Sequence, residues 1–166
     1  MSDYKPLKIT RYFSKPRADP FSVGWNGSKL EYEARNVTIT DDKGKVVFSQ
    51  KGVEVPKNWA RFPTDILASK YFYGKKGASE REYSAKQVFG RVTDFIASRG
   101  KDMGYFATDS DAKIFSDELK VLMMNQAGMF NSPVEFNFGL YDKYGVKSGS
   151  RGNYHYDFKK VLVLPM

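Results

Sequence analysis

The spacing of apolar residues changes once along the chain, at Pro56. Before Pro56, apolar and polar residues alternate on both sides of the segment Asp41-Asp42-Lys43-Gly44-Lys45, which predicts a β-hairpin with a glycine available for the left-handed position of its turn. After Pro56, apolar residues recur at helical spacing. The sequence therefore predicts an α+β fold that is mainly helical, with one β-hairpin and about three helices.

The first predicted helix covers residues 58–72. Pro63 argues for a start near residue 63, because proline fits the first turn of a helix. Four large apolar residues fall roughly along one stripe, which is expected to face the core: Trp59, Phe62, Ile66 and Tyr71.

The second and third predicted helices have clearer boundaries. The second opens with the capping box Ser79-Glu80-Arg81-Glu82 and stops at Gly100. The third begins at Thr108 and runs to about Gln126, and Gly128 ends it. Its apolar surface is wider than one narrow stripe, so we expect it to be buried on more than one side.

The predicted elements divide the 166-residue chain into three parts of one domain. Residues 1–28 form an extended arm rich in basic and aromatic residues, and residues 29–139 form the folded α+β domain. Residues 140–166 form a basic loop followed by an apolar strand at 161–164. That strand has no partner nearby in the sequence, so we expect the two terminal segments to dock on a partner chain.

Cysteine is absent, and His155 is the only histidine. These counts exclude disulfides, thiolate metal sites, a cysteine nucleophile or thiyl radical on this chain, and a multi-histidine metal site. We therefore assign no catalytic residue and no metal ligand. No apolar run approaches the length of a membrane helix, and the start lacks a secretory signal, so a cytoplasmic protein is expected.

The net charge of +8 is concentrated at the two ends of the chain. Residues 1–17 and residues 143–160 each carry a net charge of +4. Such ends suit nucleic acid, nucleotide phosphates or an acidic partner, or they are solvated tails that aid solubility. Aromatic residues lie among these cations, a pattern that also suits single-stranded nucleic acid: Tyr12, Phe13, Tyr154 and Tyr156.

Weaker candidates for chemistry lie elsewhere. The loop Gly149-Ser150-Arg151-Gly152 has the composition to hold an anion, and His155 beside Asp157 has that of a general base, although a lone histidine among aromatics is more often structural. The acidic pairs Asp41-Asp42 and Asp117-Glu118 are interpreted as a hairpin tip and a helix face.

The most distinctive local feature is Asn131-Ser132-Pro133, which predicts a turn. It is followed by alternating Val134, Phe136 and Phe138, which predict a short strand. The turn either holds the end of a buried helix through side-chain bonds to the backbone, or presents amide and hydroxyl groups to a ligand. Both interpretations stay open from the residues alone.

Several strings occur in the order and at the intervals of one known family. They are Ile9-Thr10-Arg11-Tyr12-Phe13-Ser14-Lys15-Pro16, Val55-Pro56-Lys57-Asn58-Trp59, Ala68-Ser69-Lys70-Tyr71-Phe72, Gly104-Tyr105-Phe106-Ala107-Thr108 and 130–139, which begins Phe-Asn-Ser-Pro-Val. Together they resemble the start of adenosylcobalamin-dependent (class II) ribonucleotide reductases, and the resemblance covers about residues 8–157.

The resemblance implies a role in reducing ribonucleotides to deoxyribonucleotides. In that family adenosylcobalamin generates a thiyl radical and a cysteine pair supplies the electrons. By the same resemblance, contacts to the substrate fall at Ser132 and Asn131, with Pro133, Val134 and Asn137 in the same segment. Glu135 departs from the family, which usually has a large aromatic residue there, and a carboxylate would repel a phosphate.

The resemblance ends before the family's first redox cysteine. It therefore implies the N-terminal component of a split reductase, not competent alone, that completes the ribonucleotide site. The partner is a larger cysteine-containing chain, which would hold most of the adenosylcobalamin. The alternatives are a basic, non-enzymatic module that binds nucleic acid and an inactive relic of the domain.

Overall fold

The computed structural model describes residues 5–146, and these fall into two compact units. Residues 30–88 form one, which we call the hairpin unit. The described residues on either side of it, 5–29 and 89–146, form the other, which we call the helical unit. The α+β class predicted from the sequence is confirmed.

The hairpin unit is built on two antiparallel strands, β1 (Tyr32–Thr40) and β2 (Val46–Pro56). In the turn, the Asp41 carboxylate accepts hydrogen bonds from the amides of Lys43 and Lys45, both at 2.9 Å. Gly44 has a φ of +77°, so the predicted hairpin and its glycine turn are confirmed. Three valines on the strands are buried: Val37, Val53 and Val55.

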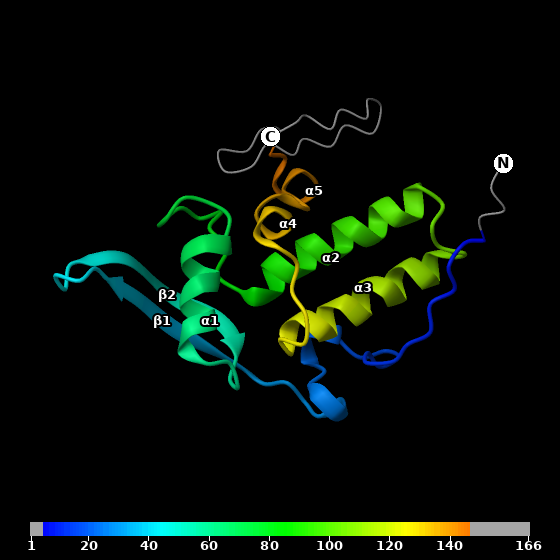
Figure 1. The fold of residues 1–166 in the computed structure, drawn as a ribbon, viewed down its shortest axis with the longest axis horizontal. Helices are drawn as coiled ribbons and strands as arrows, with labels where there is room; N and C mark the ends of the chain where they lie inside the picture. Colours follow the sequence, from blue (N-terminus) through cyan, green and yellow to red (C-terminus); the bar gives the residue numbers. More distant parts are fainter. Residues whose placement is uncertain (1–4, 147–166) are drawn as a thin grey trace. The chain divides into compact units, whose positions relative to one another are not determined.

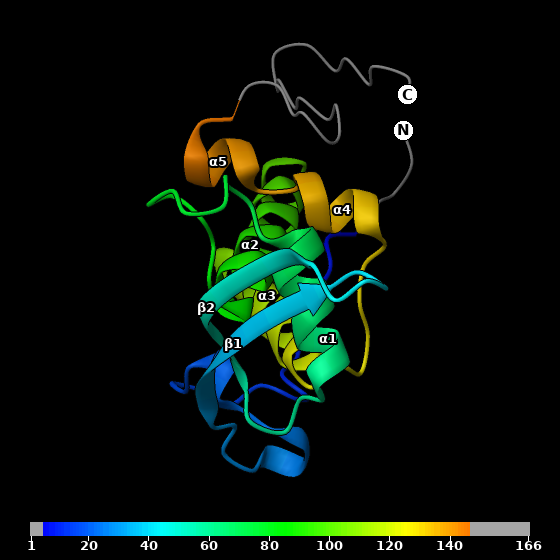
Figure 2. The ribbon, with the colours of Figure 1, turned by 90° about the vertical axis from the view of Figure 1, so that its left-hand side faces the viewer.

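Helix α1 (Arg61–Ile66) lies against the hairpin and continues into one turn of π-helix, η3 (Leu67–Tyr71) (Figure 2). The predicted helix is therefore present, but its apolar stripe is wrong. Trp59 is buried and precedes the helix, whereas Phe62 is 74% exposed. Helical spacing counted from Trp59 does not apply, because Trp59 lies outside the helix.

Helix α2 (Ala85–Asp102) begins in the hairpin unit and continues into the helical unit. The predicted capping box at 79–82 is wrong, because Ser84 and Gln87 fill that role. The Gln87 side chain accepts the Ser84 amide at 3.0 Å, and the Ser84 hydroxyl accepts the Lys86 amide at 3.2 Å. Glu82 is instead fully buried, with its carboxylate accepting the Tyr73 amide at 2.7 Å.

The predicted stop at Gly100 is also wrong, because α2 continues to Asp102. Gly100 serves close packing instead, since a Cβ atom there would lie 2.6 Å from the Phe106 ring. Gly104, with a φ of +75°, is the glycine that follows the helix end.

Helix α3 (Asp109–Met124) lies beside α2 (Figure 1). The Thr108 side chain caps it by accepting the Asp111 amide at 3.2 Å, as the sequence predicts. Val121, Met123 and Met124 are buried, which accounts for its wide apolar surface. Neither α3 nor any other helix within residues 5–146 is long and apolar enough to cross a membrane.

The segment after α3 differs most from its prediction. The strand predicted at 134–138 is a helix, α4 (Ser132–Asn137), and the predicted basic loop that starts at residue 140 opens with a second short helix, α5 (Leu140–Tyr144). Pro133 fits the first turn of α4, where a helix needs no N–H donor. Three alternating apolar residues are too few to distinguish the two-residue period of a strand from the 3.6-residue period of a helix. The strand at 161–164 lies outside the described residues.

The N-terminal arm packs on α3 of its own unit through main-chain amides. The Glu118 carboxylate accepts the amides of Phe13 at 2.7 Å and Ser14 at 2.9 Å, and the Ser14 hydroxyl as well. The Asp111 carboxylate accepts the Ile9 amide at 2.7 Å. The acidic pair Asp117-Glu118, interpreted as a helix face, thus holds the arm, through Glu118 and through the ion pair of Asp117 with Arg11. Docking of the arm on a partner chain stays a prediction.

We expect Glu118→Ala to lower the free energy of unfolding by about 2–3 kcal/mol, because hydrogen bonds to charged groups each contribute about 1.5–3 kcal/mol. Glu80→Ala is the matched control, because Glu80 is exposed, and we expect it to change stability by about 0.5 kcal/mol at most. Chemical denaturation of both variants measures the difference. Equal values for the two would contradict the role given to Glu118.

The attachment of the arm should weaken in acid. Burial raises the pKa of Glu118, but hydrogen bonds from the Ser14 hydroxyl and from arm amides outweigh it and hold the pKa below the ordinary 4.5. The Thr108 hydroxyl and the Ile9 amide likewise hold the pKa of Asp111 below 3.8. This stabilisation is complete above those ordinary values and is lost as the pH falls through the lowered pKa values. Amide NMR shifts of Ile9, Phe13 and Ser14 should therefore move together only below pH 4.5.

Candidate functional site

All five residues predicted to contact a substrate lie on α4 or at its start. Asn131 is the residue before the helix, Ser132, Pro133 and Val134 form its first turn, and Asn137 is its last residue. Asn131 and Pro133 are exposed, and the other three are partly exposed. The structure therefore places these residues together on a short helix with accessible side chains.

The two asparagines of this group have different environments. The Asn137 side chain donates from Nδ2 to the Pro133 carbonyl at 2.6 Å and so braces α4 along its length. The Asn131 side chain makes no capping bond to α4, although the Asn131 carbonyl accepts the amides of Val134 and Glu135 at 3.1 and 3.2 Å. The turn is thus held by main-chain bonds, and the Asn131 amide group is not used as a cap.

Arg91 of α2 fixes the far end of α4. Its side chain is 5% exposed, and Nη1 donates to the carbonyls of Glu135 and Phe138, both at 2.8 Å. Carbonyls in the last turn of a helix lack intrahelical donors, so a cation that binds two of them both satisfies and orients the helix end.

Glu135 is fully buried. From the sequence, its carboxylate is expected to disturb a phosphate-binding pocket. The Glu135 side chain does not lie among the exposed side chains of α4, and its effect on a phosphate stays a prediction. The residue instead belongs to the buried region where Arg91 binds its main-chain carbonyl.

Gly139 allows the chain to pass directly over the backbone of α2. It has a φ of +75°, and a Cβ atom there would lie 2.7 Å from the carbonyl carbon of Arg91 and closer still to the carbonyl oxygen. The segment is held on either side of this crossing. The rings of Phe95 and Phe138 are 5.0 Å apart, and Arg99 binds Asp142 of α5 at 3.0 Å.

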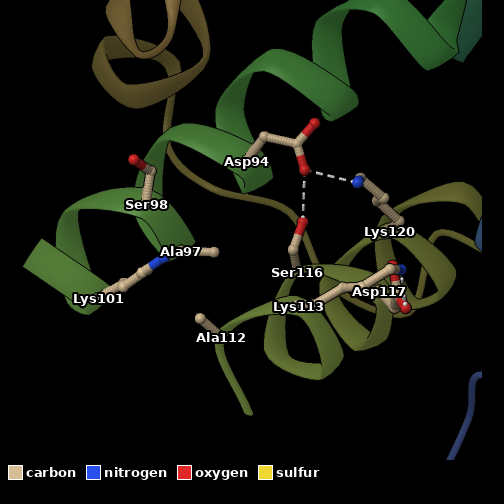
Figure 3. A pocket seen from close by; sticks show the side chains of 9 residues that line it. All are labelled: Asp94, Ala97, Ser98, Lys101, Ala112, Lys113, Ser116, Asp117 and Lys120. Atoms are coloured by element: carbon tan, nitrogen blue, oxygen red, sulfur yellow. Dashed lines mark hydrogen bonds and ion pairs between the residues drawn. The ribbon is translucent and has the colours of Figure 1, made fainter. Parts of the chain in front are cut away.

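A cavity of about 310 Å³ lies between α2 and α3, and its charges are paired (Figure 3). Lys120 binds Asp94 at 2.6 Å, and Lys113 binds Asp117 at 2.8 Å. Ser116 also donates to Asp94, at 2.7 Å. Carboxylates of the same two helices thus already engage these lysines.

Neither of the two cavities found in the described residues is large enough to enclose a cobalamin. Separately, within residues 5–146 there is no cluster of His, Cys, Asp or Glu that could hold a metal ion. A second cavity, in the hairpin unit, has about 510 Å³ and is lined in part by Arg35, whose guanidinium already binds Thr64 at 2.9 Å and Glu33 at 2.6 Å. Cavities of this size and polarity suit small ligands, and a corrinoid is much larger.

Some sequence predictions fall outside the described residues, and two residues that position α4 were not predicted. The loop 149–152 and His155 lie outside the described residues. Arg91 and Gly139 were missed. The sequence signals that could have indicated them are an arginine among the apolar residues in the middle of α2 and a glycine directly after Phe138.

Gly139→Ala should destabilise the helical unit by about 3 kcal/mol or more, because it combines left-handed strain of about 1–2 kcal/mol with overlap on the α2 backbone. Gly145→Ala is the matched control, since Gly145 has a φ of +68° and a Cβ atom there would meet nothing within 4 Å. It should show the strain alone. Denaturant unfolding of the two variants measures the gap, and equal losses would contradict the close approach.

A comparison with known protein families matches residues 33–126 to the family described as class II vitamin B12-dependent ribonucleotide reductase. The match covers most of the hairpin unit together with α2 and α3, and it ends before α4. The resemblance seen in the sequence is therefore confirmed for the region that carries the hairpin and the two long helices.

Curated relatives agree with the family match. Vitamin B12-dependent ribonucleotide reductases of Rhodopirellula baltica and Streptomyces coelicolor are 42% and 38% identical over 127 and 136 residues, covering 76% and 81% of this chain. The enzyme of that name from Agrobacterium fabrum is 28% identical over 184 aligned positions, covering 91% of this chain. The chain spans only 12–14% of the length of these relatives. It belongs to the class II, vitamin B12-dependent ribonucleotide reductase family, whose N-terminal region it matches.

Proposed function

We propose that this chain is the N-terminal component of a split, cobalamin-dependent ribonucleotide reductase and completes the enzyme's ribonucleotide site. The observation that carries the proposal is the family match over residues 33–126, which include the hairpin and the two long helices. The chain has no cysteine, so the thiols that reduce the substrate must come from polypeptide outside these 166 residues. A larger cysteine-containing chain would supply them, and the complex would work in the cytoplasm.

The contribution of this chain would be one wall of the substrate site, formed by α4. The Ser132 hydroxyl and the Asn131 amide would bind the ribose or phosphate of the nucleotide, beside Pro133 and Val134. Asn137 would support this face through its bond to the Pro133 carbonyl. The anchoring of α4 by Arg91 and Gly139 supports this role, because a binding group must be held still to be effective.

The larger chain would also hold most of the cofactor. Adenosylcobalamin, when bound, supplies the radical chemistry of the family. The described cavities of this chain do not fit a corrinoid, which supports a site built mainly by the partner. The nucleic-acid-binding alternative gains no support from the comparisons, and the paired lysines between α2 and α3 do not favour it.

Reconstitution tests the proposal as a whole. The chain should bind the larger reductase chain from the same organism at one-to-one stoichiometry in about 0.5 M salt, a concentration that screens exposed charges. The mixture, with adenosylcobalamin, should reduce ribonucleotides, and the larger chain alone should not. Full activity of the larger chain without this component would contradict the proposal.

Ser132→Ala tests the substrate contact. The loss of one hydrogen bond to the substrate should lower kcat/KM of the reconstituted enzyme about tenfold, equivalent to about 1.4 kcal/mol. Ser98→Ala is the control, because Ser98 is an exposed serine of α2. Unchanged kinetics for Ser132→Ala would remove this residue from the site.

A further inference from the structure

Three aromatic residues of the N-terminal arm lie together in a group that we call the arm cluster: the exposed Tyr12 and Trp25 and the partly exposed Phe13. Tyr12 is 84% exposed and Trp25 is 50% exposed. The Phe13 ring stacks on Trp25 with centroids 5.5 Å apart, and the Tyr12 ring meets Phe13 edge-on at 4.7 Å. Large apolar side chains gathered on a surface are typical of interaction sites.

The arm cluster is held rigidly. The amides of Phe13 and Ser14 are fixed on the Glu118 carboxylate. Beside Trp25, the Gly24 amide donates to the Ser28 carbonyl at 2.7 Å, and the Asn125 side chain binds the Val23 carbonyl at 2.9 Å. Because both ends of the cluster are tied to the helical unit, little conformational entropy would be lost when a partner binds it.

The geometry favours a protein partner over a single-stranded nucleic acid. Bases stack on open aromatic faces, whereas one face of Phe13 is covered by Trp25 at an interplanar angle of 24°. One nearby cation, Arg11, is neutralised within the chain, whereas Lys15 keeps its charge. Arg11 binds Asp117 at 2.9 Å, and the Lys15 ammonium donates to the Gly27 carbonyl at 2.6 Å.

The charge of the arm defines the chemistry of the partner. Of the five cations in residues 5–28, Arg11 is paired with Asp117, whereas the other four and the one anion, Asp19, are exposed, so the exposed charges of the arm sum to +3. An apolar patch with an acidic rim would complement both the aromatic centre and this positive surround. Polypeptide to carry such a patch is available, because the relatives have about seven to eight times the length that this chain matches, at 12–14% coverage.

We propose that the arm cluster is the surface on which the cysteine-containing reductase chain docks, through an apolar patch rimmed by acidic residues. The inference rests on the proposed function and names the contact that holds the two chains together. The cluster lies on the arm and α4 carries the candidate substrate contacts, so the two surfaces are separate parts of the helical unit.

A pair of matched double variants tests the inference. Tyr12→Ala/Trp25→Ala removes the exposed rings of the arm cluster, and Phe62→Ala/Tyr83→Ala removes two exposed rings of the hairpin unit, which are 74% and 54% exposed. Calorimetry with the larger reductase chain should give a Kd at least about 100-fold higher for the arm variant and within about threefold of wild type for the control. At saturating arm variant, kcat should equal that of wild type.

The single variant Tyr12→Ala keeps the test valid if the double variant unfolds, because a side chain as exposed as Tyr12 contributes little to stability. This single variant should raise the Kd about tenfold. Equal Kd values for wild type and both arm variants would overturn the inference and leave the proposed function standing. Failure of the wild-type chain to bind the larger chain would overturn both.

Two further outcomes would also overturn the inference by showing another occupant. One is dimerisation of the chain alone, seen by sedimentation and abolished in the arm variant. The other is binding of an oligothymidylate probe that only the arm variant loses and that rising salt abolishes.

Discussion

The position of α4 depends on one buried cation. Arg91 cannot remain buried without acceptors, because an unpaired charge in the interior is strongly destabilising. It finds acceptors in the carbonyls of Glu135 and Phe138, which the end of a short helix leaves without donors. The guanidinium thereby gains hydrogen-bond acceptors, and the two carbonyls gain a donor. Gly139 makes the arrangement possible, since only a residue without a Cβ atom fits against the α2 backbone there.

The N-terminal arm is attached by the same principle with the charges reversed. Glu118 and Asp111 of α3 accept amides of an extended segment, whereas Arg91 of α2 donates to carbonyls of a short helix. In both cases a long, regular helix supplies a charged side chain to main-chain groups that have few partners of their own. The two long helices therefore form the frame on which the irregular parts of the unit are placed.

The difference between local contacts and contacts between distant residues explains what could be predicted from the sequence. The hairpin turn and the Thr108 cap are encoded within a few residues, and both were predicted correctly. Helix α4 was missed because its six residues are too short for a period to be read. Its anchor was missed because Arg91 and Glu135 are 44 residues apart, and no local pattern reports such a contact. The candidate substrate residues were placed together only because they are nearly consecutive.

In the proposed function, a component without cysteine would contribute binding and position rather than electron transfer, and this would make rigidity important. Ordering a loop when two chains associate costs free energy that would be subtracted from their affinity. Here α4 is already fixed through its carbonyls, and the arm cluster is already fixed through the amides of Phe13 and Ser14. Under the proposed function, charged side chains bonded to main-chain groups would prepare both surfaces before a partner arrives, so that more of the contact energy would remain available for association and substrate binding.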